Sequence, residues 1–184
     1  ATMRRQGDQI AGIVTELLDL ARIEARAGRD FTMLRQPLAP LVRRVVEGLR
    51  VGEYARVPPP EGDADGAEVF VDAGKFGQAL TNVIANACKY SPAAMPVTVR
   101  LLAGAAEAGV AIADRGGGMD AETQRRIFEA FYRAESTAGV AGTGLGMSIA
   151  KEIMDIHGGR IEVESAPGEG TVVTLWLPRA APRG

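Results

Sequence analysis

Cysteine, histidine and aromatic residues are scarce in this chain of 184 residues, which contains one Cys, one His and 5% aromatic residues. The single cysteine, Cys88, cannot form an internal disulfide and fits a reducing compartment. A transition-metal site built from Cys and His ligands is not expected with so few of them. Any bound metal is therefore predicted to be a hard cation held by oxygen atoms.

Long apolar runs are absent as well. The longest uncharged stretch, residues 136–150, contains four glycines, which does not suit a helix embedded in lipid. No basic segment followed by an apolar one opens the chain, so no secretory signal is expected. The predicted location is the cytoplasm, and any membrane anchor is expected in a longer parent protein.

Charge is close to balanced, with a formal net charge of -2. Residues 1–50 hold nine Arg against six Asp or Glu, and the remainder holds 12 Lys or Arg against 17 Asp or Glu. Neither part has the density of basic residues that a nucleic-acid surface needs, so no nucleic-acid partner is predicted. A hydrophobic content of 46% excludes a disordered chain and suffices for one core with a helical appendage.

Apolar residues at three- and four-residue spacings predict a long N-terminal helix that ends at Gly28. The apolar stripe needs a partner surface, such as another helix or a second copy. The opposite face is expected to be polar. The stripe consists of Ile10, Ile13, Val14, Leu17, Leu20 and Ala21, and the polar face of Asp8, Glu16, Asp19, Arg22 and Arg26.

The remaining elements mix helices and strands without a strict alternation. Helices are expected from Pro37 to Leu49, from Asp72 (as N-cap) to about Cys88, and over residues 121–128 and 144–157. Strands are expected over residues 31–34, 68–71, 97–102, 110–114 (the central strand), 161–165 and 171–177. Residues 52–66 and 136–143 are expected to be loops, the first with at most a short strand over residues 54–57. This order predicts an α+β fold, a two-layer sandwich with a mixed sheet of about five strands and three helices on one face, preceded by the long N-terminal helix.

One helix carries three polar residues on a single face, Asn82, Asn86 and Lys89, with Tyr90 directly after them. Two amides and a cation on an otherwise apolar helix suit an anion bound together with its metal. Taken alone, the pattern fits the polar outer stripe of an amphipathic helix equally well.

Three glycine motifs follow. Asp114 stands at a strand end before Gly116, Gly118 and Met119, which suits the binding of an exocyclic amine, although a simple turn explains it better when it is considered alone. Residues 142–146 open a helix whose first backbone N–H groups suit a phosphate. Their GxGxG spacing matches neither a dinucleotide fingerprint nor a P-loop. Residues 168–171 alone indicate only a hairpin turn.

In this order and spacing, the motifs resemble the ATP-binding catalytic domain of bacterial sensor histidine kinases, within the gyrase/Hsp90/histidine kinase/MutL superfamily. Residues 82–92 match the N box, 114–118 the G1 box, 128–133 the F box, 142–146 the G2 box, and 168–171 the last glycine motif. The resemblance covers residues 31–178. It implies a Bergerat-type ATP-binding domain over residues 29–184. Residues 1–28 resemble the second helix of the dimerisation and phosphoacceptor hairpin, and would form a partial domain without the first helix and its phosphorylatable histidine.

The resemblance also implies a set of roles. ATP and Mg²⁺ are the expected cofactors, with Asp114 accepting from the adenine amine, Tyr90 flanking the purine and Asn86 holding the metal. Lys89 and Arg133 would supply charge to the phosphates, and residues 119–140 would form a lid anchored by Phe128 and Phe131. Asn82, Asn86 and Lys89 are the expected catalytic residues. The expected nucleotide contacts are Asn82, Asn86, Lys89, Tyr90, Asp114, Gly116, Gly118, Met119, Phe131, Arg133, Gly142, Thr143, Gly144, Leu145, Gly146 and Thr171.

Asn82 bears on the reaction, because the superfamily members that hydrolyse ATP carry a glutamate at the matching place. An amide there favours transfer to a histidine over hydrolysis. The one histidine in the chain, His157, lies where the family has a structural His-Gly-Gly helix end, so it is not expected to be the acceptor. The implied partners are the phosphoacceptor hairpin of the same full-length protein, a response regulator receiver domain and a second copy in a homodimer. Two alternatives stay open: a serine kinase of the anti-sigma-factor type, and a nucleotide-binding scaffold without catalysis.

Overall fold

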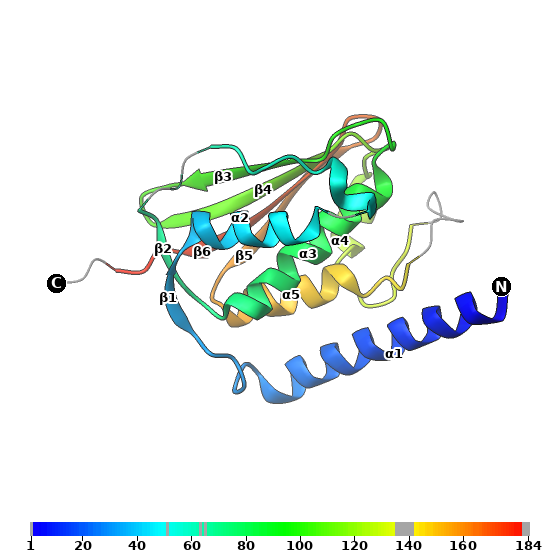
Figure 1. Cartoon of the computed structure of the whole chain (residues 1–184), viewed down its shortest axis with the longest axis horizontal. Helices are drawn as coiled ribbons and strands as arrows, with labels where there is room; N and C mark the ends of the chain where they lie inside the picture. Colours follow the sequence, from blue (N-terminus) through cyan, green and yellow to red (C-terminus); the bar gives the residue numbers. More distant parts are fainter. Residues whose placement is uncertain (1, 51, 63, 65, 135–141, 182–184) are drawn as a thin grey trace.

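The computed structural model describes residues 2–50, 52–62, 64, 66–134 and 142–181. Three helices, α2, α3 and α5, cover one face of a four-stranded sheet, as Figure 1 shows. The elements are α1 (Thr2–Arg26), β1 (Leu34–Pro37), α2 (Leu38–Leu49), the 3₁₀ helix η1 (Gly52–Arg56), β2 (Glu68–Val71), α3 (Ala73–Tyr90), β3 (Thr98–Ala103), β4 (Glu107–Asp114), α4 (Ala121–Arg126), α5 (Gly146–Ile156), β5 (Arg160–Ala166) and β6 (Gly170–Pro178). The predicted α+β class, with three helices on one face of the sheet, is confirmed.

The sheet has the strand order β3-β4-β6-β5, and its pairings are all antiparallel. β4 is an interior strand, as its apolar sequence predicts, with Val110 paired to Leu101 on one side and to Leu175 on the other. The prediction of about five strands in a mixed sheet differs in detail, because β2 pairs with β1 in a separate two-stranded sheet. The one parallel pairing among the described residues is the isolated bridge between Glu61 and Arg100.

The core lies between the sheet and the helical layer. Burial of these side chains supplies the main favourable free energy of folding, at about 25 cal/mol for each Å² of apolar surface removed from water. On α3, Asp72 caps the helix by accepting from the Lys75 N–H at 2.9 Å, as predicted. The large side chains buried most completely include Phe76, Leu80 and Ile84 from α3, Ile149, Ile153 and Met154 from α5, and Ile112, Leu175 and Leu177 from the sheet.

The C-terminal half of α1 lies beside α5 (Figure 1). Leu20 and Ile23 join the same core as the sheet and are 9% and 1% exposed. The predicted apolar stripe is only partly the packed face, because Leu17 stays 43% exposed while the half-buried Glu16 and Asp19 face the rest of the chain. The two carboxylates take this position because polar partners meet them there, as described below.

Local differences from the sequence prediction have local causes. No strand forms over residues 54–57, where the sequence allowed at most a short one within a loop. These residues belong to or follow η1, and the Val57 N–H donates to the Tyr54 carbonyl at 3.0 Å. The three prolines that follow have no N–H to give to a strand ladder. α5 begins at Gly146 rather than at Gly144, because Gly144 has φ +76°, outside the helical region. Most of the loop expected over residues 136–143 lies outside the described residues.

None of the helices in the described part of the chain is both long enough and apolar enough to cross a bilayer.

Candidate functional site

The polar face of α3 points toward the start of α5. The Asn82 Nδ2 group donates to the Gly146 carbonyl at 3.1 Å, which ties the middle of α3 to the first residue of α5. Asn86, one turn further along, is half-buried, and its amide has no hydrogen-bond partner among the described residues. The two amides therefore differ: Asn82 is engaged in holding two helices together, and Asn86 is available for a ligand.

Lys89 extends from the same face toward the glycine segment before α5. A Cβ atom placed on Gly142 would collide with the Lys89 Nζ, so the ammonium group lies directly against that segment. The same Nζ lies 4.6 Å from the centre of the Tyr90 ring. Tyr90 itself is 37% exposed. A cation and an accessible aromatic ring thus flank the end of α3, as the sequence predicts.

Asp114 ends β4 and is half-buried. Its Oδ1 accepts from the Gly116 N–H at 2.7 Å. Burial raises the pKa of Asp114 above its usual value, while the N–H groups of Gly116 and Thr171 oppose that rise. A partly desolvated carboxylate of this kind binds a donor more strongly than an exposed one does.

The glycines around Asp114 make room for the chain itself. A Cβ on Gly116 would lie 2.6 Å from the Tyr90 carbonyl oxygen, and one on Gly118 would collide with the Ala166 carbonyl. A Cβ on Gly170 would likewise collide with the Asp114 carbonyl. The sequence analysis placed Gly116 and Gly118 in a motif that suits the binding of an exocyclic amine. In the structure they allow the ends of α3, β4 and the β5–β6 hairpin to meet.

The start of α5 carries no side-chain cap at Leu145. The Leu145 N–H donates to the Thr143 Oγ1 at 3.2 Å, and the Phe131 N–H donates to the Gly144 carbonyl at 3.1 Å. The first N–H groups of a helix have no partner within the helix, and they lie at the positive end of its dipole. An uncapped start next to Asn82 and Lys89 is therefore a place where an anion can bind.

The segment between Met119 and Ala134 contains α4 and encloses a polar hollow of about 670 Å³ lined by residues 120, 122, 123, 126 and 129–134. Phe128 packs against the core, as expected of an anchor. The same expectation for Phe131 is wrong, because the residue is 57% exposed and has φ +66°. Its backbone, not its ring, makes the contact with Gly144. Residues 135–140 of the expected lid lie outside the described residues.

Two polar residues that the sequence interpretation missed fasten this segment to the hairpin. The Ser165 Oγ accepts from the Met119 N–H at 2.9 Å and donates to the Gly170 carbonyl at 2.8 Å. The Gln124 Nε2 donates to the carbonyls of Ser165 and Met119, at 2.8 and 3.1 Å. Ser165 also lies 3.0 Å from the Thr171 Oγ1. Their closeness to the glycine motifs in sequence was the one available signal.

α1 reaches the edge of the site. Glu16 accepts a hydrogen bond from the Thr143 hydroxyl, and Asp19 accepts from the Gln78 amide at 3.2 Å. These contacts explain why two acidic residues of α1 face inward. They also bring a carboxylate beside the glycine segment that precedes α5.

His157 is structural, as expected. It is 4% exposed, its Nε2 accepts from the Asp72 N–H at 3.0 Å, and its Nδ1 lies 2.7 Å from the Ile153 carbonyl. Burial lowers the pKa of His157, although the contact with Ile153 and the charge of Asp72 act in the opposite direction. The neutral ring therefore links the end of α5 to the start of α3.

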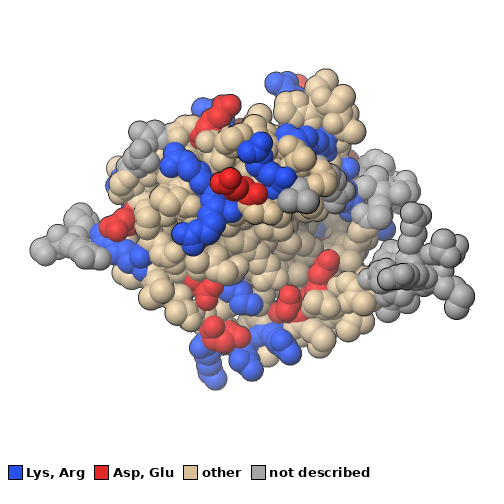
Figure 2. Space-filling view, viewed as in Figure 1, with Lys and Arg blue, Asp and Glu red and all other residues tan. Residues whose placement is uncertain are grey.

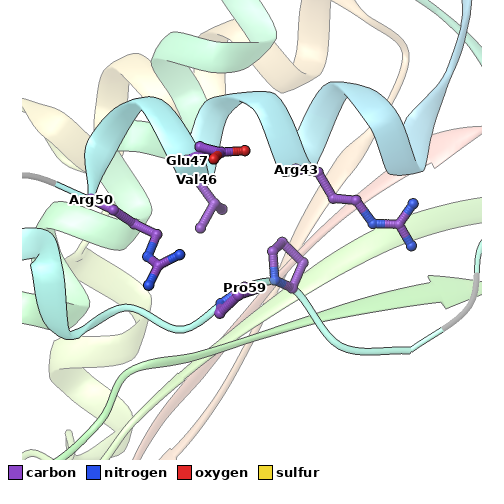
Figure 3. A pocket seen from close by; sticks show the side chains of 6 residues that line it. Arg43, Val46, Glu47, Arg50 and Pro59 are labelled. Atoms are coloured by element: carbon purple, nitrogen blue, oxygen red, sulfur yellow. The ribbon is translucent and has the colours of Figure 1, made fainter.

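A second hollow, of about 190 Å³, lies between α2 and the proline segment, far from the predicted site residues in sequence. It is lined by Arg43, Val46, Glu47, Arg50, Pro59 and Pro60 (Figure 3). Its volume is below the 300–1,000 Å³ that is typical of ligand pockets. On the face seen in Figure 2, acidic and basic side chains are interspersed and form no continuous patch of one sign.

Comparisons with known proteins agree with this geometry. Residues 71–181 match the model of the family described as histidine kinase-, DNA gyrase B-, and HSP90-like ATPase. The chain is 39% identical over 113 residues to the sensor protein IrlS of Burkholderia pseudomallei, covering 60% of this chain and 24% of that protein. It is 33% identical over 180 residues to the signal transduction histidine-protein kinase/phosphatase MprB of Mycolicibacterium smegmatis, covering 94% of this chain and 35% of that protein.

Among solved structures, full-length ShkA in complex with AMPPNP resembles the chain with a TM-score of 0.83 and 25% identity, covering 100% of this chain and 38% of that one. The chain thus spans 24% and 35% of the lengths of the two curated relatives. The family match takes in the polar face of α3, Asp114 and the start of α5. The chain therefore belongs to the family of histidine kinase-, DNA gyrase B- and HSP90-like ATPases.

Proposed function

We propose that the chain is the ATP-binding kinase domain of a sensor histidine kinase and that it transfers the γ-phosphoryl group of ATP to a histidine outside these residues. The observation that carries the proposal is the arrangement of three groups around α3. Asp114 is joined to the end of α3 through Gly116, and the uncapped start of α5 is joined to the middle of α3 through Asn82. Asn86 lies on α3, and its side-chain amide has no hydrogen-bond partner among the described residues. The proposed partners are a phosphoacceptor hairpin of the same full-length protein, a receiver domain of a response regulator, and a second copy in a homodimer.

Asp114 selects adenine in this proposal. The Gly116 N–H engages its Oδ1, and the carboxylate retains further lone pairs for the adenine N6 amine. Guanine presents a carbonyl oxygen at the corresponding place, which would leave the buried carboxylate facing another acceptor. Tyr90, at the end of α3, lies against the purine.

The phosphates lie at the start of α5, where the helix N–H groups and the Lys89 ammonium neutralise their charge. Arg133 supplies a further positive charge from the segment after α4. Thr143 and Gly144 shape the approach to the helix, since their own hydrogen bonds are made to α1, Leu145 and Phe131.

Mg²⁺ fits the residues that are present. Among the described residues no three His, Cys, Asp or Glu side chains gather as a metal site, but the free, half-buried Asn86 amide offers one oxygen ligand. Mg²⁺ is usually held by one or two protein oxygens together with phosphates and waters, which suits a single amide. When bound, the ion would offset the negative charge of the transferring phosphoryl group.

Asn82 favours transfer over hydrolysis. Its amide donates to the Gly146 carbonyl, and an amide does not take a proton from water as a carboxylate would. A neutral imidazole already has a free lone pair, so the acceptor needs no general base. We expect Asn82→Glu to raise the release of phosphate from ATP, measured as free phosphate with the wild type as reference. Unchanged phosphate release would contradict this role for Asn82.

Transfer is tested with a supplied hairpin polypeptide that carries a histidine. The chain, the hairpin, Mg²⁺ and γ-labelled ATP are incubated, and the product is divided between acid and alkali. The proposal predicts label on the hairpin that acid removes and alkali retains, as for phosphohistidine. Acid-stable label would indicate a serine kinase. ATP binding with no transfer to any hairpin would indicate a non-catalytic scaffold.

A further inference from the structure

Arg56, the last residue of η1, reaches the C-terminal end of α3. Its Nη1 donates to the carbonyls of Pro92 and Met95, at 2.6 and 3.1 Å. Its Nη2 donates to the carbonyl of Cys88 and lies 3.4 Å from that of Ser91. The guanidinium group of the half-buried Arg56 thus contacts four carbonyls, which belong to the last turn of α3 and to the turn that follows.

Arg56 forms no ion pair with a carboxylate among the described side chains. The last carbonyls of a helix have no partner within the helix and lie at the negative end of its dipole. A guanidinium group suits this place, because its planar array of donors contacts several acceptors at once. The favourable interactions of Arg56 are therefore directed at the end of α3.

The segment that Arg56 contacts, residues 88–95, forms one side of the proposed base site. Tyr90 is the last residue of α3, between the Cys88 and Ser91 carbonyls that Arg56 contacts. The Tyr90 carbonyl is the oxygen against which Gly116 packs, and the Gly116 N–H in turn holds the Asp114 carboxylate. A chain of direct contacts thus runs from Arg56 through the end of α3 to the acceptor proposed to select adenine.

We propose that Arg56 is a positioning residue for the base half of the nucleotide site: it fixes Tyr90 and, through Gly116, the Asp114 carboxylate. The phosphate half at the start of α5 is held by separate contacts, including Asn82 with Gly146. Loss of Arg56 therefore weakens recognition of the adenine base more than recognition of the phosphates, because Lys89 lies on the turn that Arg56 holds but the first N–H groups of α5 do not. This inference rests on the proposed function, because it assumes that the site binds an adenine nucleotide.

The test is a set of calorimetric titrations of the full chain with ATP, adenosine and inorganic triphosphate, each with Mg²⁺. Arg56→Met removes the donors and keeps most of the side-chain stem. It is expected to weaken ATP and adenosine by the same factor, about tenfold, which is the loss of one charge-assisted hydrogen bond. Inorganic triphosphate should lose clearly less affinity than adenosine does, because the first N–H groups of α5 stay in place. Arg56→Lys keeps the charge and should recover part of the loss.

Arg44→Met serves as the matched control, because Arg44 is exposed on α2 and makes no hydrogen bond or ion pair with a described residue of the site. Wild-type affinity of Arg56→Met for adenosine would overturn the proposal, as would an equal loss for all three ligands. Should Arg56→Met fail to fold, Arg56→Lys is judged by the same split between base and phosphate ligands.

Amide hydrogen exchange without nucleotide separates this inference from the proposed function. Faster exchange confined to residues 88–96 and 114–118 in the Arg56 variant is expected, and unchanged exchange there would contradict the inference. Failure of the wild type to bind ATP would contradict the proposed function. The exchange result would still decide whether Arg56 orders the end of α3 and residues 114–118.

Discussion

Replacing Asp114 by Asn tests the base site most selectively. The change keeps the shape of the side chain and an oxygen acceptor for the Gly116 N–H, but it removes the charge that is proposed to bind the adenine amine. A hydrogen bond to a charged group contributes about 1.5–3 kcal/mol, so the Kd for ATP should rise about 10- to 150-fold. The Asn side chain can also donate to the guanine carbonyl, so the ratio of the affinity for ATP to the affinity for GTP should fall.

The free energy of unfolding of Asp114→Asn should change differently from its affinity for ATP. Burial raises the pKa of Asp114, which means that the folded state accommodates the ionised carboxylate less well than water does. Asn removes that cost, so the free energy of unfolding at pH 7 should not fall. Because the folded state holds this proton more tightly than the unfolded state, the wild type should gain stability relative to the variant as the pH falls through the raised pKa.

The assays are calorimetric titration with ATP and GTP, and urea unfolding at several pH values. Asp155→Asn is the matched control, because Asp155 lies on the exposed side of α5, where it forms an ion pair with Lys151. It should leave nucleotide affinity unchanged. An ATP affinity of Asp114→Asn within twofold of the wild type would refute the assignment. So would a fall in stability large enough to account for the lost binding.

Three further substitutions test the framework of the site by urea unfolding. Gly118→Ala should lower the free energy of unfolding by more than the roughly 1–2 kcal/mol of a left-handed alanine, because Gly118 has φ +67° and the added Cβ would meet a carbonyl. Gly117→Ala is the control and should be nearly neutral, because its Cβ would meet nothing within 4 Å. Equal effects of the two substitutions would contradict the account. His157→Phe should cost about 1–3 kcal/mol, because the Asp72 N–H loses its partner while the Ile153 carbonyl still accepts from the backbone N–H of residue 157. Because burial lowers the folded-state pKa of His157, the wild type should lose stability as the pH falls below about 6.5. If His157→Phe lost stability over the same pH range, the loss would come from a group other than His157. Ile23→Ala, at a residue 1% exposed, should cost about 2–5 kcal/mol, against less than about 0.5 for Val14→Ala, which is 50% exposed; equal costs would mean that α1 does not pack as described.

The sequence predicted elements whose signals are local. Asp72 as an N-cap, the apolar strand that ends at Asp114, and the hairpin of residues 161–177 all follow from short patterns of caps, alternation and turns. The spacing of Asn82, Asn86 and Lys89 placed them on one helical face, because helical periodicity requires it. These features needed no knowledge of distant contacts.

Features that depend on contacts between distant segments were not predictable. Glu16 was expected on the polar face away from the core, yet it meets Thr143, which is far along the chain. Ser165 and Gln124 fasten the segment after Met119 to the hairpin, and their closeness in sequence to the glycine motifs does not specify that role. Arg56 lies in a segment that the sequence predicted to be a loop, and its four carbonyl partners come together only when α3 and η1 pack against each other. Side-chain hydrogen bonds between distant segments give no periodic signal in a single sequence.

Titration of the intact chain with adenosine nucleotides in the presence of Mg²⁺ measures the central claim most directly. The account predicts saturable heat with ATP and a much weaker response to GTP, because the Asp114 carboxylate accepts from an amine and repels a carbonyl oxygen. No heat with ATP at millimolar concentration, from material that is folded by circular dichroism, would contradict it.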